Sequence, residues 1–369
     1  MSTKCRIDPS PRMAGAVAYG IPRAAVPIDL PLDGNEGLRP PAALLAACAG
    51  IEPDMIRRYP STAALAGILA DRFGVEPARV IVTAGGDDAL DRLMRAALIE
   101  GREIVFPVPS FEMIERYARL AGGAIVEVAW PEGAYPRDAV IAAITERTAI
   151  VCVVTPNNPT GAVATGDDVR AVAEAAPHAI VLLDQAYAEL ADEDLTRAAL
   201  ELPNVVVVRS LSKAFGLAGL RIGYALGPAE IIGWLRAAGG PYTVTGPSIH
   251  LAKARLAMSQ ADVDVYLARV RFEREALRAL LRELGFAPVP SQANFVFARC
   301  PAGAPDPVAM RDALARRGIG IRAFPGKRHL GDAFRITCPG DEEDFERLSV
   351  ALREAAAELV AGGTRGGGA

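Results

Sequence analysis

The chain has 369 residues, of which 51% are hydrophobic and 23% are charged, with a formal net charge of −4 at pH 7. This balance is typical of globular proteins and excludes a disordered or fibrous chain. The charge shows no basic surplus of the kind that binds nucleic acids or anionic membranes, so we expect neither as a partner. The length predicts two domains, or one large core with a smaller one attached.

Cysteine and histidine usage argues against disulfides and metal sites. The five cysteines are scattered without a CxxC pair, which is typical of reduced thiols in the cytosol. Because His178, His250 and His329 are far apart in the sequence, we expect neither a metal site nor a histidine-activated nucleophile. Residues 1–16 carry prolines where a signal peptide has its apolar stretch, and no apolar run is long enough to cross a bilayer. We therefore expect a cytoplasmic protein.

The middle of the chain alternates short apolar runs with helical stretches. We expect strands at 80–83, 103–107, 124–129, 149–154, 179–183, 205–210 and 221–225, and helices at 87–98, 111–121 and 167–176. Several of these runs are apolar on both faces, as expected when helices cover both sides of a parallel sheet. The predicted fold class is α/β, with a mostly parallel mixed sheet and helices on both faces.

The pattern changes after about residue 247. We expect helices at 262–284, 307–316 and 341–359, and strands at 294–298, 319–322 and 333–337. These elements predict a smaller α+β unit that also recruits the N-terminal arm. We therefore expect an arm over residues 1–40, a large α/β domain over 41–250, a small α+β domain over 251–360 and a disordered glycine-rich tail over 361–369.

Polar residues follow four of the predicted strands. They are residues 85–88, residues 157–161, Asp184 with Tyr187, and residues 210–213. Because ligands of an open parallel sheet bind beyond the carboxyl ends of its strands, one pocket can gather these groups. The glycine pair Gly85-Gly86 opens a helix and is suited to a phosphate. A G-x-G-x-x-G motif and a Walker lysine are both missing, so nicotinamide and nucleoside triphosphates lack support.

Lysine usage draws attention to one amine. The only lysines are Lys4, Lys213, Lys253 and Lys327, and only Lys213 directly follows a buried strand in a loop of small residues. A partly desolvated amine can condense with an aldehyde, although a lysine that caps the sheet edge explains this placement equally well. Asp184 ends a buried strand and needs a partner, which is either a structural arginine or a pyridinium nitrogen.

Residues 210–224, Ser-Leu-Ser-Lys-Ala-Phe-Gly-Leu-Ala-Gly-Leu-Arg-Ile-Gly-Tyr, closely resemble the cofactor-lysine segment of the fold-type I pyridoxal-phosphate (PLP) aminotransferases. The segment is most similar to the histidinol-phosphate aminotransferase branch. Residues 58–60, 155–161, 184–187, 290–295 and 334–337 resemble the same family in the same order, and the resemblance covers roughly residues 19–357. It implies a PLP-dependent transaminase of amino-acid biosynthesis, a homodimer with shared active sites.

The resemblance also implies roles for individual residues on the cofactor side. Lys213 would form a Schiff base with PLP, and Asp184 would keep the pyridine nitrogen protonated. Tyr187 and Asn158 would bind the phenolic oxygen of the cofactor, and Phe111 would stack on its ring. The residues that would hold the cofactor phosphate are Gly86, Asp87, Ser210, Ser212, Arg221 and, from the neighbouring subunit, Tyr59.

On the substrate side, the resemblance implies that Arg335 clamps the α-carboxylate and that Arg322 contacts a substrate phosphate. Tyr19 and Asn35 would line the side-chain pocket. Three positions depart from the family pattern: residues 32–38 differ from the usual Asn-Glu-Asn-Pro arm, Gln185 replaces glutamate and Phe111 replaces tyrosine. The first and third departures touch the substrate side.

The functional hypothesis is transfer of an amino group between L-histidinol phosphate and 2-oxoglutarate. One alternative is an aminotransferase of the same branch acting on aromatic or other amino acids. Another is a PLP decarboxylase resembling threonine-phosphate decarboxylase, which would release carbon dioxide. A third is a regulator with an aminotransferase-like sensor domain. Such regulators attach a DNA-binding module, and the residues before residue 19 are too few to form one. The sequence leaves open the amino donor, the preferred oxo acid, the closure of the arm, and the choice between transamination and decarboxylation.

Overall fold

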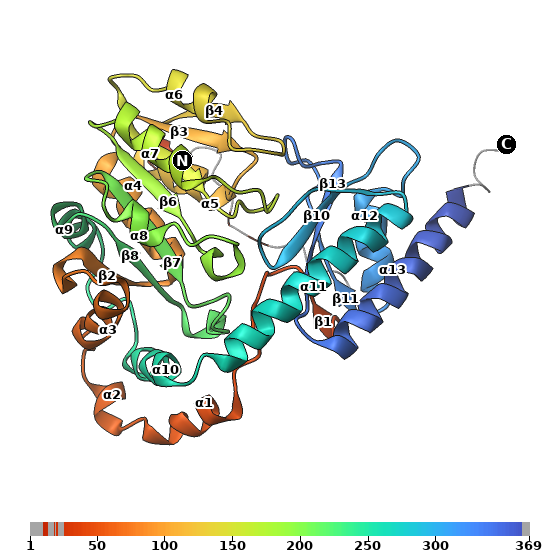
Figure 1. Cartoon of the computed structure of the whole chain (residues 1–369), viewed down its shortest axis with the longest axis horizontal. Helices are drawn as coiled ribbons and strands as arrows, with labels where there is room; N and C mark the ends of the chain where they lie inside the picture. The colour runs from red at the N-terminus through yellow and green to blue at the C-terminus, as the bar shows by residue number, and fades with distance from the viewer. Residues whose placement is uncertain (1–9, 14–17, 19, 21–25, 364–369) are drawn as a thin grey trace, which may run out of the picture.

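The computed structural model describes residues 10–13, 18, 20 and 26–363. Its larger sheet has seven strands in the order β2-β8-β7-β6-β5-β3-β4 (Figure 1). The strands are β2 (Val80–Ala84), β3 (Glu103–Val108), β4 (Ala124–Ala129), β5 (Thr148–Val154), β6 (Ile180–Asp184), β7 (Val205–Ser210) and β8 (Ile222–Leu226). Strand β8 is antiparallel to β2 and β7, and the other pairs are parallel. This mixed sheet confirms the predicted fold class.

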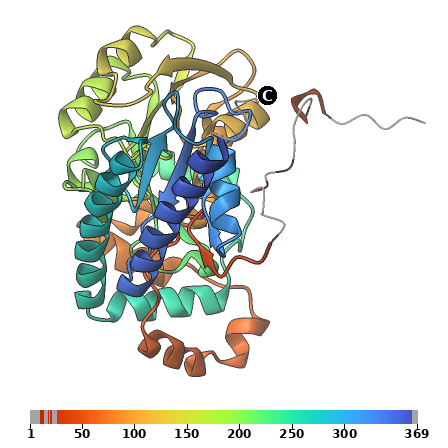
Figure 2. The same ribbon diagram turned by 90° about the vertical axis from the view of Figure 1, so that its right-hand side faces the viewer.

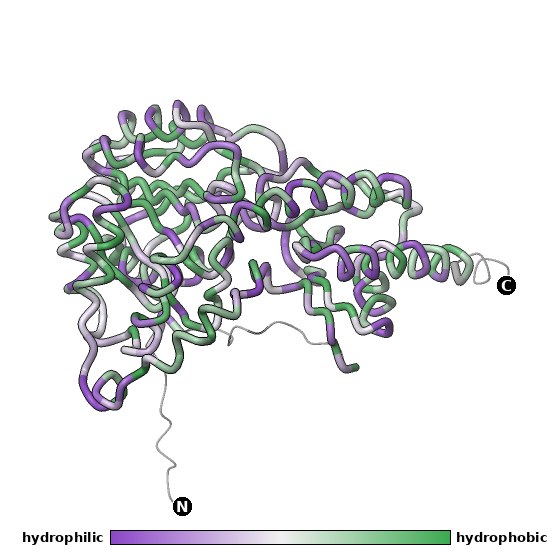
Figure 3. Tube along the Cα trace, turned by 60° about the horizontal axis from the view of Figure 1, so that its bottom comes forward, coloured by the Kyte–Doolittle hydropathy of each residue, from purple (hydrophilic) through white to green (hydrophobic). Residues whose placement is uncertain are grey.

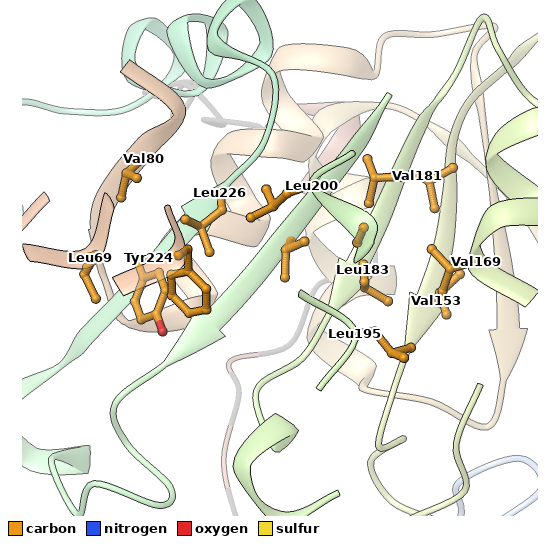
Figure 4. Close-up of a cluster of buried hydrophobic side chains, with 14 of the residues drawn as sticks. Leu69, Val80, Val153, Val169, Val181, Leu183, Leu195, Leu200, Tyr224 and Leu226 are labelled. Atoms are coloured by element: carbon orange, nitrogen blue, oxygen red, sulfur yellow. The ribbon is translucent and has the colours of Figure 1, made fainter. Parts of the chain in front are cut away.

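The side chains of each central strand are divided between two cores, because successive residues of a strand point to opposite faces of the sheet. Val153, Val181 and Leu183 belong to one buried cluster, to which Figure 4 gives a close view. Their neighbours Cys152 and Leu182 belong to the cluster on the other face. Truncating one such side chain, as in Leu183→Ala, is expected to cost about 2–5 kcal/mol of stability. The strands are therefore apolar throughout, and their polar residues come only at the ends.

Helices cover both faces of this sheet. Those on the face with Cys152 are α4 (Gly85–Ala97), α5 (Glu112–Ala121) and α9 (Ala229–Ala238). Those whose buried residues join the opposite cluster are α1 (Ala42–Ala46), α3 (Ala63–Phe73), α6 (Arg137–Ala142), α7 (Gly166–Ala175), α8 (Thr196–Ala199) and α10 (Gly246–Ala257), and α2 (Pro53–Arg57) contacts α10.

Helix α10 is one that the sequence pattern does not predict. Its glycine and proline look like helix breakers, but they lie at its first two positions. Thr245 is the N-cap residue and accepts a hydrogen bond from the backbone N–H of Ser248. A proline is favourable in the first turn, where its missing N–H has no partner to lose.

A second, smaller sheet is antiparallel, with the order β12-β13-β10-β9. Its strands are β9 (Ala287–Pro288), β10 (Phe295–Arg299), β12 (Arg322–Ala323) and β13 (Ala333–Thr337). It packs with α11 (Ala261–Glu283), α12 (Pro307–Ala315) and α13 (Glu342–Gly363), and Figure 2 shows α11 and α13 side by side over it. In Figure 3, hydrophobic and hydrophilic residues alternate along the helix that leads to the C-terminus, as expected for a helix with one buried face.

The arm joins this smaller unit. Strand β1 (Leu30–Pro31) pairs in parallel with β11 (Ile319–Gly320), and Leu30 and Leu32 belong to the core of the smaller unit. The prediction of one strand over 319–322 is therefore wrong. The chain forms two strands there because β11 pairs with the arm while β12 pairs with β13.

Helix α13 continues to Gly363, beyond residue 361 where we expect the tail to begin; residues 364–369 lie outside the described residues. The domain boundaries themselves stay a prediction. No helix within the described part of the chain combines the length and the low polarity that a membrane span requires.

Candidate active site

A cavity of about 730 Å³ lies at the carboxyl ends of the central strands and is lined by residues of the larger sheet, the smaller sheet and the arm. It brings together most of the predicted site residues: Asn35, Gly86, Asp87, Phe111, Asn158, Asp184, Tyr187, Ser210, Ser212, Lys213, Arg221, Arg322 and Arg335. Tyr59 does not line it, and Tyr19 lies outside the described residues.

Lys213 follows β7 and is half-buried in the cavity wall. Its Nζ donates a hydrogen bond to the backbone carbonyl of Asn35 at 2.8 Å and lies 5.4 Å from the ring centroid of Tyr187. The arm passes directly against the backbone of Lys213, since a Cβ atom at Gly37 would lie 1.6 Å from the Lys213 carbonyl oxygen. Only glycine fits at position 37, so the arm fixes the loop that carries the amine.

Asp184 ends β6 with its carboxylate buried in the same cavity wall. Burial raises its pKa to about 7, and the amine of Lys213 only partly opposes that effect. Its Oδ1 accepts a hydrogen bond from the backbone N–H of Ala186 at 3.0 Å. Within the described residues it forms no ion pair, because Arg209 on the neighbouring strand pairs instead with Glu189 and Asp194. The structural arginine considered above is therefore not the partner, and the carboxylate is suited to a cationic N–H donor in the cavity.

One end of the cavity is suited to a phosphate. Gly86 and Asp87 lie in the first turn of α4, where unpaired backbone N–H groups and the helix dipole favour an anion. Ser210 and Ser212 are buried beside them, and Arg221 Nη2 lies 3.1 Å from Asp87 Oδ2. Arg221 has φ = +53°, an uncommon backbone conformation for a residue with a side chain.

Tyr187 and Asn35 form a hydrogen-bonded pair that the sequence does not predict. Asn35 Nδ2 donates to Tyr187 Oη at 2.9 Å, and Thr337 Oγ1 donates to Asn35 Oδ1 at 3.1 Å. Asn35 is almost fully buried and has φ = +52°. It lines the cavity, as expected, but its amide is used to hold the phenol in place.

Arg335 projects from β13 toward the arm and the larger sheet. Its Nη2 donates to the backbone carbonyl of Asp33 at 2.7 Å, and its Nη1 donates to Asn158 Oδ1 at 2.5 Å. The guanidinium also lies 5.1 Å from the ring centroid of Phe295. Asn158 therefore accepts from Arg335 and keeps its amide hydrogens for another acceptor in the cavity.

Arg322 lies at the other end of the cavity among charges that the sequence analysis misses. Its side chain is 9% exposed, and Nη2 lies 3.6 Å from Glu112 Oε1. Its Nη1 has no hydrogen-bond partner among the described residues. Lys327 Nζ donates to Glu112 Oε2 at 2.7 Å, and Arg328 Nη1 donates to Glu127 at 2.7 Å. No local pattern announces these residues, because only the β12–β13 loop (residues 324–332) brings them together with α5 and β4.

Two predicted cofactor contacts stay predictions. Phe111 lines the cavity just before α5. Tyr59 is 82% exposed and stacks on Tyr242 with a centroid distance of 4.6 Å. Tyr59 does not line this cavity, so its contact with the cofactor of a neighbouring subunit stays a prediction.

The comparisons with known proteins agree on one family. The description "Aminotransferase class I and II" belongs to the family whose sequence model matches residues 30–352. The chain is 33% identical over 354 residues to the aromatic amino acid aminotransferase of Mycobacteroides abscessus, with 93% of this chain and 98% of that protein covered. It is 35% identical over 323 residues to the histidinol-phosphate aminotransferase of Dinoroseobacter shibae, with 86% and 88% covered.

Among solved structures, histidinol-phosphate aminotransferase from Sinorhizobium meliloti in complex with pyridoxal-5'-phosphate is similar with a TM-score of 0.86 at 26% identity. The match covers 97% of this chain and 100% of that one. Together with the mixed sheet, it defines the fold as that of the fold-type I PLP enzymes. The chain belongs to the class I and II aminotransferase family and is a PLP-dependent transaminase, which confirms the resemblance seen in the sequence.

The described residues fit the cofactor that this family implies. The cavity holds an amine suited to an aldehyde, a buried carboxylate without an ion-pair partner among the described residues, and a helix N-terminus flanked by two serines. These groups match the aldehyde, the pyridine nitrogen and the phosphate of PLP in chemical type.

Proposed function

We propose that the protein transfers the amino group of L-histidinol phosphate to 2-oxoglutarate. The observation that carries this proposal is Arg322, a nearly buried guanidinium in the cavity wall with an Nη1 that has no partner among the described residues. A buried cation of this kind requires an anion, and a substrate phosphate or a distal carboxylate supplies one. Lys327 adds a second positive charge at the same end of the cavity.

We propose that the cofactor is held by the groups that line the opposite end. Asp184 would keep a proton on the ring nitrogen, and Tyr187 and Asn158 would donate to the phenolic oxygen. The first turn of α4, the two serines and Arg221 would bind the phosphate. Phe111 would pack on the ring. These residues contribute position and charge, and PLP when bound supplies the electron sink that acidifies the substrate Cα–H bond.

The remaining groups would act on the substrate. Arg335 would bind the α-carboxylate of 2-oxoglutarate, and of any amino-acid donor, with its planar guanidinium. L-Histidinol phosphate has no carboxylate, so its anionic contact would be made through its phosphate. Lys213 Nζ would take the proton from Cα, because it is an amine in the cavity wall beside the groups proposed to hold the cofactor, 5.4 Å from the ring centroid of Tyr187. In this arrangement Asn35 holds Tyr187 in place from the arm.

A second candidate donor is an aromatic amino acid. Phe111, Phe324 and Leu330 line the cavity and provide apolar surface for a ring. Glu112 already supplies Arg322 and Lys327 with a negative charge. The names of relatives support both candidates, since one is an aromatic amino acid aminotransferase and another a histidinol-phosphate aminotransferase.

We further propose a cytoplasmic homodimer in which Tyr59 reaches the cofactor phosphate of the neighbouring subunit. Leu45, Ile56, Tyr59 and Tyr242 are all exposed, and the rings of Tyr59 and Tyr242 stack on each other, which supports an apolar contact with a second chain. Cys48, Cys152, Cys300 and Cys338 are unpaired, which is usual in a reducing compartment.

The test is a donor screen of the PLP-loaded enzyme with 2-oxoglutarate as acceptor. The donors are L-histidinol phosphate, phenylalanine, tyrosine and threonine phosphate, and both kcat/KM and carbon dioxide release are measured. We expect the highest kcat/KM for histidinol phosphate and no carbon dioxide. A higher kcat/KM for phenylalanine or tyrosine would favour the second candidate, and stoichiometric release of carbon dioxide would identify a decarboxylase.

A further inference from the structure

Glu112 connects the two sides of the cavity at its substrate end. It is the first residue of α5, and its Oε2 accepts a hydrogen bond from Lys327 Nζ at 2.7 Å. Its Oε1 lies 3.6 Å from Arg322 Nη2. Arg322 belongs to β12 and Lys327 to the β12–β13 loop, and all three side chains line the cavity. One carboxylate of the larger unit therefore serves two cations of the smaller one.

The other carboxylates in this part of the cavity wall have different partners. Glu115 pairs with Arg119 at 2.8 Å, and Glu127 pairs with Arg328 at 2.7 Å. Within the described residues, Glu112 is the only carboxylate within 4 Å of Arg322. The Arg322 side chain is 9% exposed, so water stabilises its positive charge far less than that of a surface arginine. The stabilisation of this charge therefore depends on Glu112.

We propose that Glu112 is a specificity-determining residue, a counter-anion in the cavity wall that compensates Arg322 and Lys327 when the substrate has a neutral distal group. A substrate with a distal phosphate or carboxylate displaces it from both cations. This inference rests on the proposed function and states which residue sets the balance between its two candidate donors.

The geometry allows such an exchange. The separation of 3.6 Å between Glu112 and Arg322 exceeds a hydrogen bond, and Arg322 Nη1 has no partner among the described residues. The side chain of Glu112 is 36% exposed, so its carboxylate can turn into water once another anion takes its place. Without Glu112, a neutral substrate would leave Arg322 desolvated beside an apolar group, which is unfavourable.

This property matters for a donor with a neutral distal group, because a transaminase takes its donor and its acceptor in turn in one cavity. 2-Oxoglutarate has a distal carboxylate, whereas phenylalanine has a neutral ring. Glu112 lets a substrate with a neutral distal group bind without leaving a buried, uncompensated charge. In return, a substrate with a distal anion binds more weakly. Specificity is then a difference between two binding free energies, and one charge shifts that difference.

The test compares the wild-type PLP-loaded enzyme with Glu112→Gln, which keeps the shape of the side chain and removes its charge. We expect the ratio of kcat/KM for histidinol phosphate to kcat/KM for phenylalanine to rise about tenfold, mainly through KM. Calorimetric titration with two unreactive ligands gives a second readout. Glutarate should bind more tightly to the variant and 3-phenylpropionate more weakly, so that their affinity ratio changes in the same direction by about the same factor.

Two matched variants separate the counter-anion from other effects of the substitution. Glu127→Gln breaks another ion pair between the β12–β13 loop and the larger unit without touching Arg322. Glu115→Gln removes one negative charge from the same helix and the same cavity wall. We expect both to keep the two ratios within about twofold of wild type. An equal change in Glu127→Gln would mean that loop attachment is responsible, and an equal change in Glu115→Gln would mean a general effect of charge; either result overturns the proposal.

The two readouts also distinguish failure of this inference from failure of the proposed function. A wild-type enzyme that transaminates none of the donors disproves the function, and the titrations then still decide the role of Glu112. Active enzymes with unchanged ratios in both assays disprove the role of Glu112 alone. Glu112→Ala is the second variant should Glu112→Gln not fold, and it must change the ratios in the same direction.

Discussion

The two ends of the cavity are built in different ways. At the cofactor end, the side chains follow directly after β6 and β7 or open α4, so the packed core of the larger sheet fixes their positions. At the substrate end, Arg322, Arg335 and Asn35 come from the smaller sheet and the arm. An ion pair connects Arg322 to the larger unit, and hydrogen bonds connect Arg335 and Asn35 to it. One end is therefore positioned by strands that are buried on both faces, and the other by contacts between side chains of different units.

We expect the largest effect from a substitution at the centre of the cofactor end. Lys213→Ala removes the amine and should lower kcat by about 10³-fold or more, because no other lysine among the described residues lines this end of the cavity. The absorbance of the cofactor bound through the amine, near the visible edge, should disappear as well. A normal absorbance in a folded variant would contradict the assignment of the lysine.

The next effect concerns the buried carboxylate at the same end. Because burial raises the pKa of Asp184 from 3.8 to about 7, the folded cofactor-free chain keeps a proton that the unfolded chain releases between those pH values. The free energy of unfolding therefore falls as the pH rises from about 4 to about 7. Asp184→Asn removes this loss and should make the cofactor-free protein more stable at pH 8, by at most about 4 kcal/mol.

Urea unfolding of both cofactor-free proteins at pH 4.5 and pH 8 checks this expectation. The stability difference should be small at the lower pH and large at the higher one. The same variant should bind PLP more weakly than wild type, since the amide cannot keep a proton on the ring nitrogen as a carboxylate does. A stability difference that does not depend on pH would contradict the burial of an uncompensated charge.

A smaller effect is expected at the substrate end. Arg335→Lys keeps the charge but loses the planar pair of donors, and should lower kcat/KM about 10–100-fold for substrates with an α-carboxylate, such as phenylalanine and 2-oxoglutarate. The variant should still bind the cofactor, because Lys213 and the residues proposed to hold the phosphate belong to the larger unit. Loss of the cofactor in this variant would show that the two ends are less independent than the structure indicates.

The smallest effect lies where the arm meets both ends. Asn35→Ala removes the hydrogen bond to Tyr187 Oη and should lower kcat/KM about fivefold, corresponding to roughly 1 kcal/mol for one hydrogen bond. The pH at which the cofactor absorbance changes should move too, because the phenol loses its donor. Thr337→Val is the matched control: it loses the contact to Asn35 but keeps the Asn35–Tyr187 bond, so that pH should not move.

The larger sheet matches the sequence prediction closely, and the residues predicted for the cofactor, apart from Tyr59, line one cavity, while their roles stay predictions. Strand β4 and strand β7 have the predicted bounds, and β6 ends at Asp184, one residue later than expected. The strands were recognisable because their runs are apolar on both faces. Tyr59 was predicted from a motif, but its contact with a neighbouring subunit stays a prediction.

The sequence by itself determined the fold class and the family, and it predicted the residues suited to PLP, because short runs of strand and loop carry that information in consecutive positions. The tertiary structure alone decided how Glu112, Arg322 and Lys327 meet, and how Asn35 reaches Tyr187. Asn35 and Tyr187 are 152 residues apart in the chain, and Glu112 and Lys327 are 215 residues apart. Such a separation in the chain has no fixed relation to distance in space. Charged side chains at such contacts choose among several partners by geometry and desolvation, and only the folded chain sets both.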